Sequence, residues 1–438
     1  MRRTASPSRP SGRYAVGLRP SLDPDAYFGV PSQDKEARRT NQNTTEMGLD
    51  GPRSFRNDLS KPNLRGAVES RTVISVRVAI ALVLPSRHLL CRESEVMAND
   101  LSKPDPSVIL DLLQAFRWSK TMFAAVDLGV FDALAEGPLS AEALSKRLKA
   151  NPDALTRLLD GCVGLQLLDR DDRNYRNTPA ASAYLCRNSP QSVTGYVNYS
   201  NSFYWRLWGN LEDAVREGTN RWKQAFGWDD NIFANVFRTE DARREFLLAM
   251  HGFGLMTSPE AVAAFDLSRF RRFVDVGGAT GHLAMAACER YSNMQGVVFD
   301  LAEVVPLARK LVGASKVAGR IEFVAGDFFA DPLPPGDIYG LGRILHDWPE
   351  AKIHQLLTRI YECLPPGGGV LIMEKLVDED RRGPVWALMQ SLNMLTLMEG
   401  KERTLSEYEM LCTRAGFARV YGSRNATPLD AVLALKAG

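Results

Sequence analysis

The chain has 438 residues, enough for two or three domains, and its 45% hydrophobic and 24% charged residues are typical of a globular protein. The formal net charge of +2 is unevenly distributed: residues 1–96 carry 16 Lys and Arg against 10 Asp and Glu, whereas residues 97–438 carry 38 against 42. The mildly acidic body argues against a broad basic face, so we expect no nucleic-acid partner.

The first 96 residues do not read as a domain. They are rich in Arg, Ser, Pro and Asn, and no sustained helical or strand period precedes Thr72. The apolar run from Thr72 to Pro85 is too short to cross a bilayer and contains Arg77, so we expect no membrane partner. Residues 1–96 are predicted to be a disordered extension, or an over-long start with Met97 as the true initiator.

The six cysteines are scattered along the chain, and none of them forms a CxxC or CxxxC pair. This spacing predicts neither a zinc site nor a disulfide framework, and we expect no metal. A reducing compartment, the cytoplasm, is the expected location.

Residues 97–195 are predicted to be a small, mostly helical domain. The segments "LSAEALSKRL" and "NPDALTRLLDGCVGLQLL" indicate two helices with Ser140 and Asn151 as N-caps, and the charged, turn-rich "LDRDDRNYRNTP" follows them. Helix, helix and β-ribbon is the order of a winged helix. The second helix balances its basic and acidic residues, which favours a protein–protein role over DNA binding.

Residues 196–438 are predicted to be a second, α/β domain. Aromatic-rich helices lead into short apolar runs that alternate with helical stretches: "RFVDVGG", "GVVFD", "RIEFVAGD", "DIYGLGRIL" and "GVLIMEKLV". This alternation predicts a Rossmann-like parallel sheet covered on both faces. Ligands in such sheets bind at the carboxyl ends of the strands, so functional residues are expected directly after each run.

The first run ends in a glycine-rich loop, "VDVGGATGH". Counted from Gly277, the third and sixth places are Ala279 and His282, so the dinucleotide fingerprint fails and a nicotinamide-dependent dehydrogenase is disfavoured. Gly277 and Gly278 still allow a ligand to lie against the backbone.

The second and third runs each end in an acid. Asp300 is placed to accept the hydroxyls of a ribose, which does not by itself distinguish NAD from another ribose-bearing cofactor. Asp327 is placed to accept from an adenine amine, and Phe328 to cover the ring. Ribose and adenine recognition without a pyrophosphate site fits S-adenosyl-L-methionine.

Five motifs, in this order, resemble one family: "FVDVGGATG", "VVFDLAEVV", "GDFFADPLP", "RILHDW" and "EGKERTLSEYEMLCTRAGF". They are similar to the class I S-adenosylmethionine-dependent O-methyltransferases of the plant caffeate and animal hydroxyindole type, and most similar to the acetylserotonin O-methyltransferase group. The resemblance runs from about Ser107 to the C-terminus. It implies an N-terminal winged-helix-like dimerisation domain, a homodimer and a small aromatic substrate.

The resemblance also implies roles for single residues. Gly277, Gly278, Asp300, Asp327, Phe328 and Arg343 would bind the cofactor, as positions that match the family's motifs. His346 would be the general base, oriented by Glu374 and Glu402. Asp347, Asn393 and Met394 would contact the substrate, and Leu397 stands where the hydroxyindole enzymes tend to carry glutamine.

The residues leave alternatives to O-methylation open. A general base with neighbouring acidic residues does not identify the atom that accepts the methyl group, so an N- or C-methyltransferase of the same fold is one alternative. A winged-helix regulator with an inactive methyltransferase domain is another, and it would bind DNA with a steep salt dependence.

Overall fold

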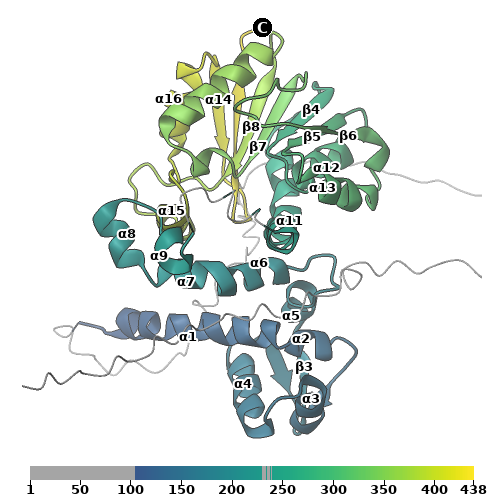
Figure 1. Ribbon diagram of the computed structural model, residues 1–438, viewed down its shortest axis with the longest axis vertical. Helices are drawn as coiled ribbons and strands as arrows, with labels where there is room; N and C mark the ends of the chain where they lie inside the picture. The colour runs from purple at the N-terminus through teal and green to yellow at the C-terminus, as the bar shows by residue number, and fades with distance from the viewer. Residues whose placement is uncertain (1–103, 229–232, 234–236, 238) are drawn as a thin grey trace, which may run out of the picture. The chain divides into compact units, whose positions relative to one another are not determined.

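The computed structural model describes residues 104–228, 233, 237 and 239–438 (Figure 1). The predicted extension, residues 1–96, lies outside these described residues. Residues 111–438 belong to one compact unit. Among the helices of the described part, none is long and apolar enough to span a membrane.

The N-terminal elements follow the predicted order of helix, helix and β-ribbon. Ser140 and Asn151 are the N-caps, because their side chains accept hydrogen bonds from the backbone N–H of Ala143 and Ala154. The strands form an antiparallel sheet of order β1-β3-β2. The elements are α1 (Ser107–Asp127), α2 (Val130–Ala133), β1 (Leu139–Ser140), α3 (Ala141–Leu148), α4 (Pro152–Gly164), β2 (Leu168–Arg170), β3 (Asn174–Asn177) and α5 (Pro179–Tyr184).

A series of helices rich in aromatic residues leads into the sheet. Tyr199, Tyr204 and Trp222 are buried here and pack with Met394 and Leu397 from much later in the chain. These helices therefore pack against the later segment that contains Met394 and Leu397, which belongs to the candidate site. Its elements are α6 (Thr194–Tyr199), a π-helical turn (Ser200–Tyr204), α7 (Trp205–Trp208), α8 (Leu211–Glu217), α9 (Trp222–Phe226) and α11 (Glu240–Ala263).

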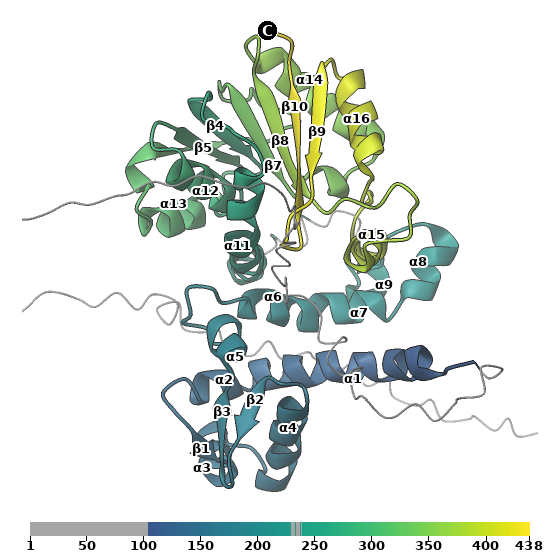
Figure 2. The ribbon, with the colours of Figure 1, turned by 180° about the vertical axis from the view of Figure 1, so that it is seen from behind.

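The C-terminal part is a seven-stranded sheet of order β6-β5-β4-β7-β8-β10-β9 (Figures 1 and 2). The first five strands in this order are parallel, and β10 is antiparallel to both of its neighbours. The strands are β4 (Arg272–Val276), β5 (Gln295–Asp300), β6 (Ile321–Ala325), β7 (Ile338–Gly342), β8 (Gly369–Glu374), β9 (Arg419–Ser423) and β10 (Asp430–Leu435). The predicted Rossmann-like sheet is confirmed.

Helices cover both faces of this sheet, as expected for a mostly parallel sheet. One apolar cluster gathers around α12 and the opposite one around α14 and α16. The helices that follow the first strand are α12 (His282–Arg290), α13 (Val305–Gly313), α14 (Glu350–Cys363), α15 (Val385–Leu397) and α16 (Leu405–Arg414).

The fourth parallel strand is shorter than the apolar run that predicts it. β7 ends at Gly342, and Arg343 has a left-handed backbone with φ of +60°, which ends an extended strand. The following residues, Leu345–Asp347, form a 3₁₀ turn instead of more strand. His346 therefore lies on a turn beyond the carboxyl end of β7.

Candidate active site

A cavity of about 500 Å³ lies at the carboxyl ends of the parallel strands. Residues from four separate strand ends and from α15 reach it, although they are up to 117 positions apart in the chain. Eight residues predicted to bind or react line it: Gly277, Asp300, Asp327, Phe328, Arg343, His346, Asp347 and Met394. Four others lie outside its lining: Gly278, Glu374, Asn393 and Glu402.

The glycine loop after β4 leaves no space for side chains. Gly277 has φ of +64°, and a Cβ there would lie 2.6 Å from Cδ1 of Ile344. A Cβ at Gly278 would lie 2.8 Å from Cγ of Asp275. The bare backbone of Gly277 thus forms a wall of the cavity against which a flat or extended ligand can lie.

Asp300, at the end of β5, is held by the same loop. Its Oδ2 accepts a hydrogen bond of 2.7 Å from the N–H of Ala279, and its Oδ1 accepts one from Leu301. Burial raises the pKa of Asp300 to about 6, although the two N–H donors oppose that shift. An oriented carboxylate in the cavity suits the recognition of a diol such as a ribose.

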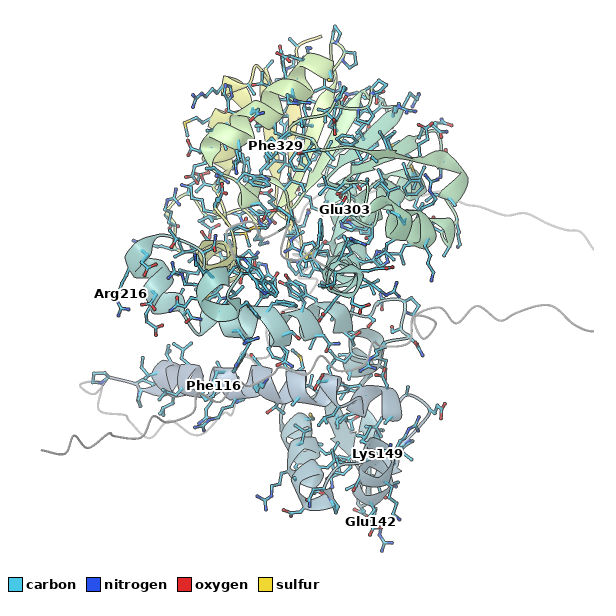
Figure 3. The ribbon with its side chains drawn as sticks, viewed as in Figure 1. Phe116, Glu142, Lys149, Arg216, Glu303 and Phe329 are labelled. Carbon is cyan, nitrogen blue, oxygen red and sulfur yellow. The ribbon has the colours of Figure 1, made fainter. Side chains whose placement is uncertain are left out.

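Asp327 and Phe328 follow β6. Oδ1 of Asp327 accepts from the N–H of Phe329, which orients the carboxylate, and the rings of Phe328 and Phe329 lie 4.7 Å apart. Phe329, labelled in Figure 3, packs against the apolar cluster on the face of the sheet that α14 covers. An acceptor beside an aromatic face is the arrangement that an adenine ring requires.

Arg343 lies at the end of β7 with its guanidinium 5.1 Å from the ring of Phe253 and its Nη1 3.0 Å from Sδ of Met250. Both contacts come from α11, which fixes the cation at the cavity wall. Arg343 is thus one of the cationic groups that line the cavity.

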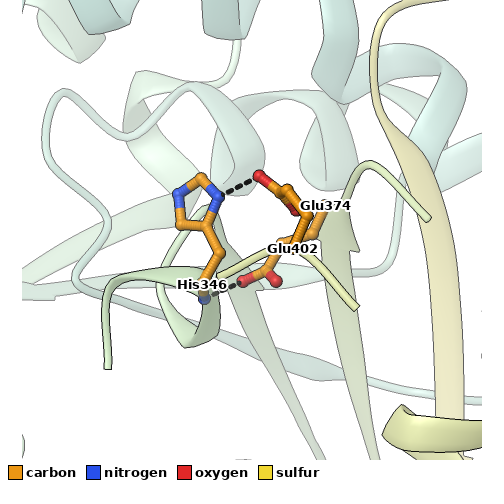
Figure 4. A group of neighbouring side chains, drawn as sticks. All are labelled: His346, Glu374 and Glu402. Carbon is orange, nitrogen blue, oxygen red and sulfur yellow. Dashed lines mark hydrogen bonds and ion pairs between the residues drawn. The ribbon is translucent and has the colours of Figure 1, made fainter. Parts of the chain in front are cut away.

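His346 is paired with Glu402, which follows α15. Nδ1 of His346 lies 2.6 Å from Oε1 of Glu402, a pair that Figure 4 draws. Nε2 of His346 lies 3.5 Å from Oδ1 of Asp347. Because a carboxylate oxygen accepts, Nδ1 is the donor and Nε2 carries the lone pair in the neutral ring. Oε2 of Glu402 is buried without a hydrogen-bond partner in the described part of the chain, so Glu402 directs its charge at the imidazole.

Glu374 makes its hydrogen bonds to the backbone of the turn. Its Oε1 accepts from the N–H groups of Leu345 (2.6 Å) and His346 (3.0 Å), and the hydroxyl of Tyr408 donates to its Oε2. Glu374 therefore supports the position of His346, whereas Glu402 orients the ring. One ring nitrogen of His346 and one carboxylate oxygen each of Glu374 and Glu402 lie within 4.8 Å of one another.

Burial and charge act in opposite directions on the titration of this group. Burial disfavours the imidazolium, but attraction and the hydrogen bond of Glu402, with smaller contributions from Glu374 and Asp347, raise the pKa of His346 to about 9. Burial raises the pKa of Asp347 to about 7, against the effect of His346 and Arg343. Burial likewise raises the pKa of Glu374.

The predicted substrate contacts fall into two kinds. Met394 is 1% exposed and lines the cavity directly. Asn393 lies outside the lining, and its Oδ1 accepts a hydrogen bond of 2.8 Å from Nε1 of Trp208. The remaining apolar lining is mostly aromatic or long-chained: Phe233, Phe237, Phe246, Phe329, Trp348, Leu397 and Met398.

Two other histidines lie near the glycine loop and are neutral. His251 pairs through Nδ1 with Oγ1 of Thr280, and His282 pairs with Oγ of Ser258, both at 2.8 Å. Burial lowers the pKa of His251 to about 4 and that of His282 to about 3. Neither pairs with a carboxylate in the described residues, so His346 alone has the setting of a base there.

Sequence reasoning overlooked Arg403 and Tyr408. Both belong to the motif "EGKERTLSEYEMLCTRAGF", in which Glu402 was the residue predicted to act in the site. Arg403 is 2% exposed and Tyr408 is fully buried, and both bond to the groups that hold His346. The signal that could have found them is their place in one motif with Glu402.

Comparisons with known proteins agree with this geometry. An O-methyltransferase domain family model matches residues 208–418, and an O-methyltransferase dimerisation domain model matches residues 110–187. The acetylserotonin O-methyltransferase of Bos taurus is 42% identical over 337 residues, which cover 75% of this chain and 97% of that protein. The chain belongs to the O-methyltransferase family.

Two further relatives show how far the similarity extends. The crystal structure of human N-acetylserotonin methyltransferase in complex with SAM has a TM-score of 0.73 at 40% identity, and it covers 77% of this chain and 99% of that one. A Homo sapiens protein described as a probable bifunctional dTTP/UTP pyrophosphatase/methyltransferase protein is 41% identical over 336 residues. The matched region covers 54% of that second protein, about half its length.

The predicted family, fold class, O-methyltransferase activity and cofactor are therefore confirmed. The cofactor of this O-methyltransferase family is S-adenosylmethionine, and the cavity fits it. The bare backbone at Gly277 and the oriented carboxylates of Asp300 and Asp327 line one continuous space. The chain also carries the family's dimerisation domain.

Proposed function

We propose that this O-methyltransferase methylates a hydroxyl oxygen of a small aromatic acceptor, a phenol or a hydroxyindole, with His346 as general base. The observation that carries the proposal is the buried pair of His346 and Glu402. Nδ1 of His346 is bonded to Glu402, its Nε2 lies 3.5 Å from Oδ1 of Asp347, and His346 lines the cavity. Bound S-adenosylmethionine supplies an electrophilic methyl group on a cationic sulfur. The protein's own part is to position the acceptor and take its proton.

His346 suits this task because its pKa is close to that of the acceptor. A phenol titrates near ~10 and an ordinary histidine near ~6.5, a gap of roughly 3.5 units that costs about 5 kcal/mol. A pKa of about 9 for His346 narrows the gap to about one unit, or about 1.4 kcal/mol. Glu402 then stabilises the imidazolium that forms.

The cofactor would be held by residues around the glycine loop. In this proposal Gly277 and Gly278 leave room for it, Asp300 accepts from the ribose, and Asp327 accepts from the adenine amine. Phe328 covers the adenine ring, and Arg343 lies at the cofactor's edge. The support is their position: five of the six line the cavity, and Gly278 supports the loop from outside.

The acceptor would be small, flat and largely apolar. Phe233, Phe237 and Met394 line the remaining cavity, which favours an aromatic ring over a sugar or a peptide. Asp347 would accept a polar hydrogen of the acceptor near Nε2 of His346. Asn393 is the third proposed substrate residue; it is next to Met394 in α15 but lies outside the cavity lining, as does Trp208, which donates to it.

We further propose a cytoplasmic homodimer with a winged-helix-like dimerisation domain at residues 97–195 and a methyltransferase domain at residues 196–438. The dimerisation model and the exposed apolar side chains of α1 support the dimer: Leu112 is 66% exposed, Leu113 59% and Phe116 55% (Figure 3). Free thiols at the five described cysteines suit a reducing compartment.

Mass spectrometry of a phenol and hydroxyindole panel, with N-acetylserotonin included, tests the reaction. The full chain is incubated with S-adenosylmethionine, and His346→Ala is run as the control. We expect a product heavier by one methyl group that fragmentation places on oxygen, and its loss in His346→Ala. Methylation on nitrogen or carbon, or cofactor binding without any product, would contradict the proposed acceptor class.

A further inference from the structure

The turn that carries His346 depends on outside groups for its position. The turn has two backbone hydrogen bonds of its own, from Asp347 N to Ile344 O and from Trp348 N to Leu345 O, each of 3.3 Å. Glu374 holds the N–H groups at the start of the turn. The carbonyl groups of the turn also accept from outside it: that of Asp347 accepts from the N–H of Glu399 at 3.3 Å, and those of Leu345 and Trp348 accept from Arg403.

Arg403 bridges two of these carbonyl groups. Its Nη1 lies 3.3 Å from the carbonyl oxygen of Leu345, and its Nη2 lies 3.1 Å from that of Trp348. Nη1 also donates to the carbonyl of Lys401 at 3.0 Å. Because the guanidinium is planar and rigid, these bonds fix the distance between the two ends of the turn, with His346 between them.

The backbone around Arg403 is also held in place by its neighbours. Its carbonyl oxygen accepts a hydrogen bond of 2.9 Å from Val377, and the next residue, Thr404, is the N-cap of α16. Gly400 packs so closely on the turn that a Cβ there would lie 2.3 Å from the carbonyl oxygen of His346. The side chain of Arg403 is thus held between a helix start and the turn.

We propose that Arg403 is a positioning residue for methyl transfer, which acts by bridging the carbonyls of Leu345 and Trp348 and so holding the imidazole of His346 at Glu402. Arg403 is absent from the cavity lining, so it acts through His346 and not on the substrate. The proposal rests on the proposed function of His346 as the base.

Arg403→Lys tests this role because lysine retains the buried charge but cannot bridge two carbonyls in a fixed plane. Arg320→Lys is a matched control: Arg320 also bridges backbone carbonyls, those of Cys288 and Met294, but does not line the cavity. We expect the kcat of Arg403→Lys to fall about tenfold or more. The KM for the acceptor and the dissociation constant of S-adenosylmethionine should stay near wild-type values, whereas the pH at half-maximal rate should fall, because a weakened pair with Glu402 raises the pKa of His346 less. Arg320→Lys should retain its kcat.

Imidazole NMR provides a readout that needs no acceptor. The chain has five histidines, so the Nδ1 proton shared between His346 and Glu402 can be assigned by comparison with His346→Ala. We expect this downfield proton in the wild type and in Arg320→Lys, and its loss or broadening in Arg403→Lys. That result supports the positioning role even where the acceptor panel gives no product.

Three results would overturn the positioning role. An unchanged downfield proton with unchanged kcat in folded Arg403→Lys would show that the bridge does not hold His346. An equal loss of kcat in both arginine variants would show a general structural effect. A loss of cofactor binding in Arg403→Lys alone would place the residue in the cofactor site instead.

Discussion

Nδ1 of His346 and Oε1 of Glu402 lie 2.6 Å apart, and their side chains are only 3% and 0% exposed. A charge-assisted hydrogen bond in so dry a setting is strong, because little water competes for either partner. It fixes both the tautomer and the orientation of the ring.

Glu402→Gln should remove the charge that sustains the pair while retaining the size of the side chain. We expect the pKa of His346 to fall from about 9 towards its ordinary value, because attraction to Glu402 is the main factor raising it. The kcat should fall about 100-fold, since the ring loses its orientation and the imidazolium its partner. An NMR titration of the imidazole and steady-state kinetics measure the two effects. Glu322→Gln, an exposed site paired with Arg272, should change neither.

The stability of the free enzyme should depend on pH through His346. Its folded pKa of about 9 lies above the ordinary ~6.5, so folding favours the protonated ring. This stabilisation is fully present below about pH 6.5 and is lost as the pH rises through about 9. The wild type should have a higher free energy of unfolding than His346→Gln. We expect this difference to be larger at about pH 6 than at about pH 10, by on the order of 3 kcal/mol. Denaturant unfolding at both pH values would show the effect, and an equal difference at both would contradict it.

Tyr408→Phe should disturb the base through Glu374. The tyrosine hydroxyl donates to Oε2 of Glu374, so its removal raises the pKa of that carboxyl and weakens its negative charge near His346. The pKa of His346 should then fall, and the acid limb of the rate profile should move to lower pH. Tyr339→Phe is the matched control, since Tyr339 is also buried and bonds the carbonyl of Pro334 outside the cavity lining. Both variants should lose about 1 kcal/mol of stability, but only Tyr408→Phe should shift the profile.

Gly277→Ala should weaken cofactor binding. Alanine at φ of +64° is strained, and its Cβ would meet Ile344, which borders the same cavity. We expect the dissociation constant of S-adenosylmethionine, measured by calorimetry, to rise at least about tenfold, which corresponds to ~1.4 kcal/mol. Gly164→Ala, at a helical glycine with no atom within 4 Å of the added Cβ, should leave the affinity unchanged. Equal affinity in both variants would show that the loop adapts without cost.

The sequence by itself determined the order of elements and the kind of cofactor. The caps at Ser140 and Asn151, the glycine loop and the acids after successive strands all depend on residues close together in the chain, where period and turn chemistry decide the local structure. His346 was placed after the fourth parallel strand for the same reason, and only the extent of that strand was overestimated.

Only the tertiary structure decided which acidic residue contacts which part of His346. His346 and Glu402 are separated by 56 positions, so no local pattern tells that Glu402 meets the ring while Glu374 meets the backbone. The same holds for Arg403, whose bonds to Leu345 and Trp348 exist only after β8 and the start of α16 have packed beside the turn. Side-chain direction and close packing are set by the whole fold, because they depend on which distant surfaces meet.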